Sequence, residues 1–314
     1  MTDRPGKENM MFDATDPRAT LARPAARNRA AGKAFPATYA RFYDEEPQES
    51  TAGSRTWISR GQTFVLAYTT ADAGARQSFS RRDQADEFVL LLPDRGTIAE
   101  IVANGERLQV AGHSVTFLPP GDSDITLEQG GTMVRLFTVQ AADLAAKASN
   151  AALYDTPNTL VPPLQAWPAS PGGDTIRSYS LDVAPEPGRF GRIFRCSTFM
   201  VNYLEPREGP RDPALLSPHH HDDFEQCSLA LSGDYIHHLR WPWTTNCADW
   251  RDDEHEFCGS PSVAVIPPPA IHTSQAVGTG LNQLVDIFCP PRTDFSEKPG
   301  WVLNAADYPL AAKE

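Results

Sequence analysis

Histidine and acidic side chains gather in one short segment of this chain. Seven residues beginning at His219 read His-His-His-Asp-Asp-Phe-Glu, and a later proline-rich run ends in His272. Taken as His219-x-His221-x3-Glu225 with His272, the pattern supplies three imidazoles and one carboxylate. Such a donor set suits one divalent transition metal and leaves coordination positions open for water or substrate. The pattern therefore predicts a metal site.

The spacing within this segment predicts that the side chains share one side of a strand. His219 and His221 are two residues apart and Glu225 has the same parity, so all three point the same way where the chain is extended. The three adjacent histidines leave a second register open, in which His220 and Asp222 point inward. An exposed histidine-rich loop that binds no metal is the structural alternative.

Short apolar runs bounded by turn residues make up most of the chain. The sequence has 314 residues with 28 Pro and 21 Gly, which favours many short elements over a few long helices. One segment, 141–152, reads as a helix. The expected strands are of ordinary length and fall in two blocks, at 63–68, 87–92, 98–102, 114–118 and 133–138, and then at 176–181, 193–203, 226–231, 235–240, 262–266 and 282–288.

Changes in composition divide the chain into four parts. Residues 1–48 are expected to be an N-terminal arm, with a short helix around 25–33. Residues 49–152 form the first strand-rich domain, 153–175 a proline-rich linker, and 176–314 the second strand-rich domain.

The two strand-rich blocks carry the same spacing of motif residues. In the first block Arg81-x-Asp83-x3-Glu87 corresponds to the histidine segment, and Asp124 takes the place of His272. This indicates an internal repeat in which the first copy has lost every histidine. We expect these four side chains to pair in a salt-bridge cluster and to hold no metal.

These motifs resemble those of the cupin superfamily, which has H-x-H-x3/4-E followed by Gly, and later P-x-G-x2-H. The resemblance covers residues 50–305 or so, and two motif pairs in one chain are similar to a bicupin. Two departures concern turn geometry. Pro269 stands where the family usually has Gly, and the gap from Glu225 to Gly233 is one residue longer than the commonest form.

The resemblance implies an all-β chain of two tandem jelly-roll barrels, the first degenerate and the second metal-binding. It implies ligands that point inward and hold one ion, with Fe(II) as first choice and Mn(II), Ni(II) or Zn(II) as alternatives. The first reaction class is a dioxygenase acting on a small polar organic substrate, because an imidazole-rich site suits substrate plus O2. A redox-neutral isomerase, lyase or decarboxylase is the second class, and a non-catalytic ligand-binding bicupin is the third. A homodimer is expected by analogy.

Four further side chains are candidates for the same cavity. Alternation sends either His237 or His238 inward, and His238 is the candidate acid or base. Arg240 shares its parity and is a candidate for binding a substrate carboxylate. Cys227 shares the parity of the proposed carboxylate ligand, and Trp241 suits a partly apolar substrate. The structural alternatives are a buried histidine, a solvated arginine, and ordinary packing of the cysteine and tryptophan.

Charge and hydropathy exclude several classes of partner. The net charge of −12 repels phosphate backbones, so no nucleic-acid partner is expected. No apolar stretch has the length that spans a bilayer, and no signal-peptide core follows the start. The five cysteines are expected to be reduced thiols, so we expect a cytoplasmic protein that acts on a small molecule.

Overall fold

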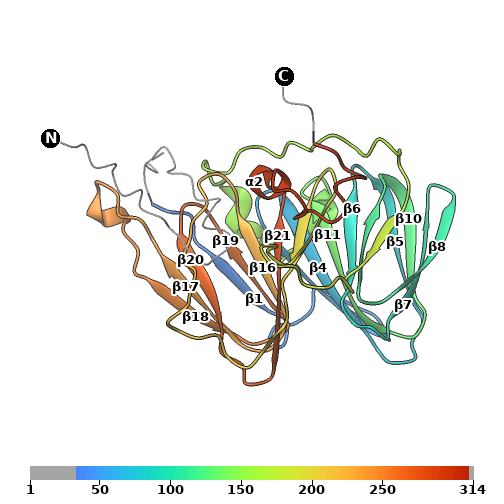
Figure 1. Cartoon of the computed structure of the whole chain (residues 1–314), viewed down its shortest axis with the longest axis horizontal. Coiled ribbons are helices and arrows are strands. Elements are labelled where there is room, and N and C mark those ends of the chain that lie inside the picture. Colours follow the sequence, from blue (N-terminus) through green and yellow to red (C-terminus); the bar gives the residue numbers. More distant parts are fainter. Residues whose placement is uncertain (1–32, 311–314) are drawn as a thin grey trace.

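Two β-barrels follow one another along the chain (Figure 1). The computed structural model describes residues 33–310. The expected arm up to residue 32, and with it most of the expected short helix, lies outside the described residues. No helix within 33–310 has the length and apolar character needed to cross a membrane.

The N-terminal barrel closes a large sheet against a small one. The large sheet has the order β12-β9-β6-β11-β4-β3-β2 and the small one β5-β10-β7-β8. Its own strands are β2 (Glu49–Ser50), β3 (Ser54–Arg60), β4 (Phe64–Ala71), β5 (Gln77–Gln84), β6 (Phe88–Leu92), β7 (Ile98–Ala103), β8 (Glu106–Ala111), β9 (Ser114–Leu118), β10 (Gly121–Leu127) and β11 (Gly131–Thr138). Helix α1 (Ala142–Lys147) and the 3₁₀ turn η2 (Ala151–Asp155) follow, where one helix was expected.

The C-terminal barrel repeats this arrangement. Its large sheet has the order β1-β19-β16-β21-β14-β13, with β15 also on β21, and its small sheet is β18-β17-β20. Its own strands are β13 (Arg192–Arg195), β14 (Met200–Tyr203), β15 (Arg207–Glu208), β16 (Gln226–Ser232), β17 (Tyr235–Arg240), β18 (Glu254–Cys258), β19 (Ser262–Ile266), β20 (Ile271–Ala276) and β21 (Leu281–Phe288), with the short η3 (Cys247–Asp249) and α2 (Thr293–Ser296). The orders β9-β6-β11-β4-β3 and β19-β16-β21-β14-β13 match strand for strand, so β16 occupies the position of β6.

Each barrel receives one strand from the other half of the chain. Strand β1 (Thr38–Arg41) lies in the segment expected to be an arm, yet it pairs with β19 of the C-terminal barrel. Strand β12 (Arg177–Ser180) lies in the segment assigned to the second domain, yet it pairs with β9 of the N-terminal barrel. Both exchanged strands cover what would otherwise be an unpaired sheet edge.

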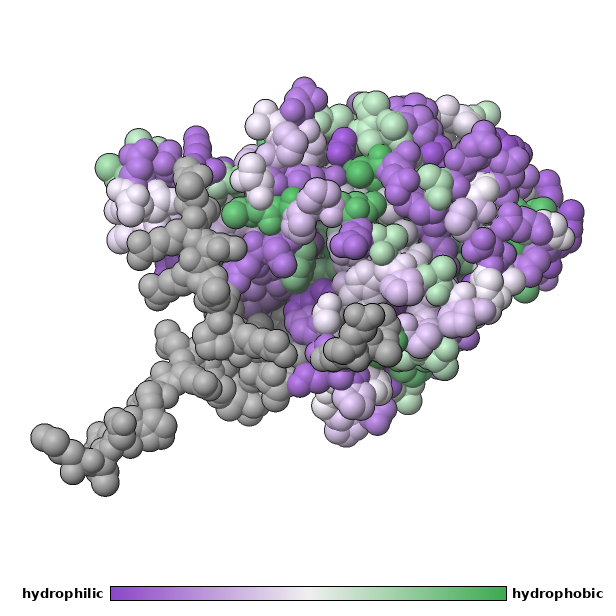
Figure 2. All heavy atoms as spheres, turned by 90° about the horizontal axis from the view of Figure 1, so that it is seen from above, coloured by the Kyte–Doolittle hydropathy of each residue, from purple (hydrophilic) through white to green (hydrophobic). Residues whose placement is uncertain are grey.

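The two large sheets pack face to face and share one hydrophobic core. On β6, Val89 and Leu91 enter this shared core, whereas Phe88 and Leu90 point into the N-terminal barrel. Both faces of β6 are therefore buried, which explains its continuous apolar sequence. Figure 2 shows mostly hydrophilic residues over the N-terminal barrel, at the right of the view, and hydrophobic residues in small separate groups.

Candidate metal centre

Three histidines from two segments converge inside the C-terminal barrel. Ligand nitrogens of His219, His221 and His272 all lie within 4.8 Å of one another, and all three side chains are buried. Backbone pairing brings the segments together, because His219 N donates to His272 O over 3.0 Å and His272 N donates to His219 O over 2.7 Å. The register with His219 and His221 inward is therefore the one the structure adopts. His220 instead lies beside Asp222, 3.3 Å away.

Backbone carbonyls fix how two of these rings are protonated. Nδ1 of His219 lies 3.0 Å from the oxygen of Ser217, and Nδ1 of His272 lies 2.9 Å from the oxygen of Ala270. A carbonyl oxygen only accepts, so each Nδ1 carries the hydrogen and each neutral ring keeps its lone pair on Nε2. Burial, with the nearby positive charge of Arg292, lowers the pKa of His221 well below its usual value. Burial thus keeps the ring of His221 in the neutral form that binds metals.

Gln226 presents an oxygen to the same point. Its Oε1 lies 3.0 Å from Nε2 of His221 and 3.3 Å from Nε2 of His272. Its Nε2 donates to Ser228 Oγ over 3.0 Å and to Asp286 Oδ1 over 3.2 Å. Because a carboxylate accepts hydrogen bonds, Asp286 holds the amide nitrogen and so turns the amide oxygen toward the histidines.

This donor set fits a divalent cation. Nε2 of His272 and Oε1 of Gln226 both carry lone pairs and approach to 3.3 Å, so neither brings a proton to the other. A cation between them satisfies both atoms. Three imidazole nitrogens and one amide oxygen suit first-row metals such as Fe(II), Mn(II), Ni(II) or Zn(II).

The prediction that Glu225 is a ligand is wrong. Its Oε2 accepts from the backbone N of Gln62 over 2.6 Å, and its Oε1 lies 3.3 Å from the Tyr154 hydroxyl. Burial raises its pKa to about 7. Glu225 immediately precedes β16, and alternation places it on the side of Cys227, which faces the N-terminal barrel, while Gln226 faces the barrel interior.

A cavity of about 470 Å³ adjoins these donors. His219, Gln226 and Asp286 line part of its wall. Arginines, aliphatic side chains and hydroxyl groups line the remainder. His219 and Gln226 thus face a space that a small molecule can enter.

Similar folds occur among solved structures, whereas no family model and no curated protein matches this sequence. The oxalate decarboxylase from Lactobacillus farciminis, in a formate complex, has a TM-score of 0.54 at 15% identity, over 81% of this chain and 86% of its own. The oxalate decarboxylase from Bacillus subtilis at pH 4.6 gives 0.53 at 13% identity, over 87% and 83%. AerE from Microcystis aeruginosa gives 0.53 at 8% identity, over 78% and 97%.

The chain has the bicupin fold. In this fold Gln226, and not Glu225, stands at the position that the H-x-H-x3/4-E motif fills with Glu. The sequence contained one signal of this, namely the gap to Gly233, which counted from Glu225 is one residue longer than the commonest form. Counting from Gln226 removes the discrepancy.

Alternation also corrects the expectations for Cys227 and His238. Cys227 is fully buried in the core between the barrels, so it does not line the cavity. His238 points out of the small sheet, where its Nδ1 lies 2.7 Å from Nδ1 of His255 and its Nε2 lies 2.9 Å from Oε1 of Gln275. The inward residue is His237, whose Nδ1 lies 2.8 Å from Ser274 Oγ.

The structure places Arg240 and Trp241 outside the cavity that adjoins the donors. Arg240 lies on the solvated face and pairs with Asp253 over 2.7 Å, with 70% of its side chain exposed. Trp241 is buried against Leu239, and the Arg251 guanidinium lies 4.4 Å from the centre of its ring. Arg240 is thus a solvated arginine, and Trp241 packs in the core.

In the N-terminal barrel of this bicupin the four expected residues do not pair with one another. Arg81 forms two hydrogen bonds to Asp143, and the backbone N of Asp83 donates to Asp122. Asp124 accepts from Arg82 and Ser80. Glu87 is buried between the barrels, where it accepts from Ser197 and Tyr308. The expected salt-bridge cluster is therefore absent among residues 33–310, because Arg81 lies over the ring of Phe137 and reaches Asp143, while Asp83 is exposed. Apolar side chains fill this barrel.

Proposed function

We propose that the C-terminal barrel binds one divalent transition metal and that the protein is a metal-dependent enzyme acting on a small organic acid. His219, His221, His272 and Oε1 of Gln226 would hold the ion. The observation that carries this proposal is the convergence of three buried imidazoles whose donor nitrogens lie within 4.8 Å of one another. When bound, the metal would supply Lewis-acid polarisation of substrate oxygens.

The chain's own residues set the charge of the site. Gln226 contributes no charge, and the carboxylate of Asp286 lies behind its amide, at 3.2 Å from Nε2. A divalent ion with these groups therefore leaves a net charge of about +1, which favours an anionic substrate. The three histidines are buried, and these surroundings of low polarity strengthen the attraction.

We infer a redox-neutral reaction on a carboxylate, such as decarboxylation, as the first candidate. The support is the cationic site beside a cavity, together with the likeness in fold to proteins described as oxalate decarboxylases. Oxygen-dependent chemistry with Fe(II) is the second candidate, and the three-imidazole set favours it.

Metal analysis tests the site, and gas exchange separates the two reactions. Untagged protein should carry about one equivalent of a first-row metal, and His221→Ala should carry little. His255→Ala, on the outer face of the small sheet, is the matched control and should keep the metal. Equal metal in the wild type and His221→Ala would refute the site. Release of CO2 from added 2-oxo acids without oxygen supports the first reaction, whereas turnover that requires O2 supports the second.

A further inference from the structure

The cavity beside the proposed metal ligands is much larger than a two-carbon diacid. It measures about 470 Å³, which lies in the usual range for organic ligands. One water molecule takes about 30 Å³, so the cavity has the space of roughly 15 waters, whereas a diacid with six heavy atoms displaces only about three. A ligand with a longer carbon body would fill it.

Two arginines give one wall of the cavity a positive charge. The side chain of Arg207 forms no hydrogen bond or ion pair with any residue of 33–310, and it is exposed at the rim. Arg211 is fixed in place, because its Nη2 donates to Leu215 O over 2.8 Å and to Ser217 Oγ over 2.7 Å. The oxygen of Ser217 in turn accepts from Nδ1 of His219. The loop that orients the first histidine therefore also orients Arg211.

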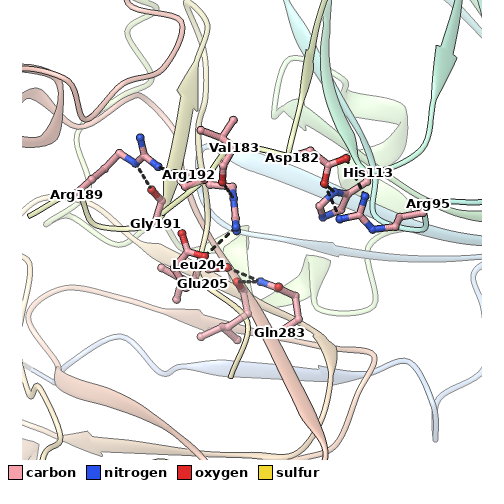
Figure 3. Close-up of polar contacts among 12 residues, drawn as sticks. Arg95, His113, Asp182, Val183, Arg189, Gly191, Arg192, Leu204, Glu205 and Gln283 are labelled. Carbon is pink, nitrogen blue, oxygen red and sulfur yellow. Dashed lines mark hydrogen bonds and ion pairs between the residues drawn. The ribbon is translucent and has the colours of Figure 1, made fainter. Parts of the chain in front are cut away.

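The carboxylates that face the cavity are already engaged. Glu205 is paired with Arg192 over 2.8 Å, and Asp286 accepts from the amide described above. Figure 3 shows Arg192 directed at Glu205, and beside it Arg189 directed at Gly191. Arg189 also donates to Ala184, so it serves the local loop. The guanidinium of Arg207 therefore remains available to an anion, and Arg211 lies on the wall of the same cavity.

Apolar side chains form another part of the wall. Leu215 is 63% exposed, and in a cavity wall an exposed leucine is a surface that an apolar ligand can cover. The apolar members of the lining are Phe190, Leu204, Leu215, Leu216 and Leu284. Charge and apolar surface thus lie on the walls of one cavity.

We propose that this cavity takes an organic acid with an apolar carbon body, larger than a two-carbon diacid. Its acid group lies against Arg207, its carbon chain lies along the leucines, and its far end, with the oxygen atoms that the metal would polarise, faces His219 and Gln226. This inference deepens the proposed function and rests on it only for the chemistry at that far end.

Calorimetric titration with butanoate, hexanoate, octanoate, decanoate and oxalate tests the inference, with 1-octanol as the uncharged match of octanoate. We expect affinity to rise about threefold to fourfold for each methylene that enters the cavity. Arg207→Gln should weaken octanoate roughly tenfold and leave 1-octanol unchanged. Leu215→Ser should weaken both. The matched controls are Arg76→Gln, in the other barrel, and Leu281→Ser, which is 48% exposed and outside the cavity.

Three results would overturn the inference: oxalate binding more tightly than octanoate, affinity independent of chain length, or equal losses in the variants and their controls. Repeating the titration on His221→Ala protein separates this inference from the proposed function. If the wild type holds no metal, but acid binding still depends on chain length and on Arg207, the acid cavity is supported and the proposed metal-dependent enzyme is refuted. If the wild type holds metal but binds none of the acids, the proposed metal site is supported and the acid cavity is refuted.

Discussion

The carboxylate of Asp286 holds the amide of Gln226 with its oxygen toward the three histidines. Nε2 of Gln226 donates to Oδ1 of Asp286 over 3.2 Å, and Ser228 Oγ donates to the same oxygen over 2.9 Å. An amide, and not the carboxylate of the H-x-H-x3/4-E motif, thus faces the three histidines, and a buried carboxylate stands directly behind it. Groups behind the ligands commonly orient them in this way.

We expect the effects of substituting Gln226 and Asp286 to be strongly non-additive. Gln226→Glu alone removes the donor to Asp286 and puts two carboxylates side by side, so we expect metal-free protein to lose about 1–3 kcal/mol of unfolding free energy. Asp286→Asn alone leaves the amide of Gln226 free to turn, and we expect at least about tenfold weaker metal binding. Urea unfolding and metal titration measure the two effects.

In the double variant the carboxylate and the amide exchange places. We expect Gln226→Glu/Asp286→Asn to recover most of both losses, because the hydrogen bond reforms with its polarity reversed. Additive losses in the double variant would show that the two side chains do not act on each other.

The sequence predicts most of the fold, because the relevant signals are periodic. Strands such as β6 and β19 follow from apolar runs of strand length, and the repeat follows from matched spacing in the two halves. The exchange of β1 and β12 was not predictable, since a four-residue strand carries no information about its partner. Sheet pairing over such distances depends on tertiary contacts.

The predictions for Glu225, Cys227 and His238 were wrong for one reason: the alternation of side chains along the strands was assigned one residue out of phase. Both faces of β16 are buried, so apolar and polar patterning does not show which face lines the cavity. A shift of one residue directs Gln226 rather than Glu225 toward the histidines and turns Cys227 away from the cavity. The same shift on β17 exchanges His238 for His237. The three histidines of the proposed metal site were less ambiguous because their mutual spacing constrains them.

Glu225 lies so close to Gly61, across the boundary between the barrels, that no space is left for a side chain at residue 61. A Cβ added to Gly61 would lie 2.5 Å from Oε2 of Glu225 and closer still to the ring of Phe64. We expect Gly61→Ala to lower the unfolding free energy by about 1–3 kcal/mol through overpacking. Gly96→Ala is the control, because no atom lies within 4 Å of its added Cβ. Equal midpoints of urea unfolding for the two variants would contradict this account.

His237 predicts a pH dependence of stability in acid. Burial lowers its pKa to about 3, from 6.5 for the exposed side chain, with smaller contributions from neighbouring positive charge. Between these values the unfolded chain binds a proton that the folded chain does not, so stability falls as the pH falls from 6.5 toward 3. This group contributes a slope of up to about 1.4 kcal/mol per pH unit.

A variant without the imidazole isolates this effect. His237→Gln can keep the hydrogen bond to Ser274, and its unfolding free energy, measured with a chelator present, should depend less steeply on pH in this window. Carboxylates elsewhere titrate alike in both proteins and cancel in the difference. Parallel curves for wild type and variant from pH 6.5 to 4 would show that His237 accepts a proton in the folded state.

In the first barrel, Glu87 is the residue that corresponds to Glu225 in the internal repeat, and we expect it to stabilise the fold. Its buried carboxylate accepts from Ser197 Oγ and from the Tyr308 hydroxyl, both over 2.6 Å, and so joins the N-terminal barrel to the second half of the chain. Tyr308→Phe leaves this carboxylate with one donor fewer, and we expect a loss of about 1–3 kcal/mol of unfolding free energy. Tyr43→Phe, at a side chain that is 47% exposed, should cost much less, because water can replace its hydrogen bond to Gly259. Metal content should be unchanged in both variants, since neither tyrosine touches the histidines; a selective loss of metal in Tyr308→Phe would mean that the first barrel controls the geometry of the second.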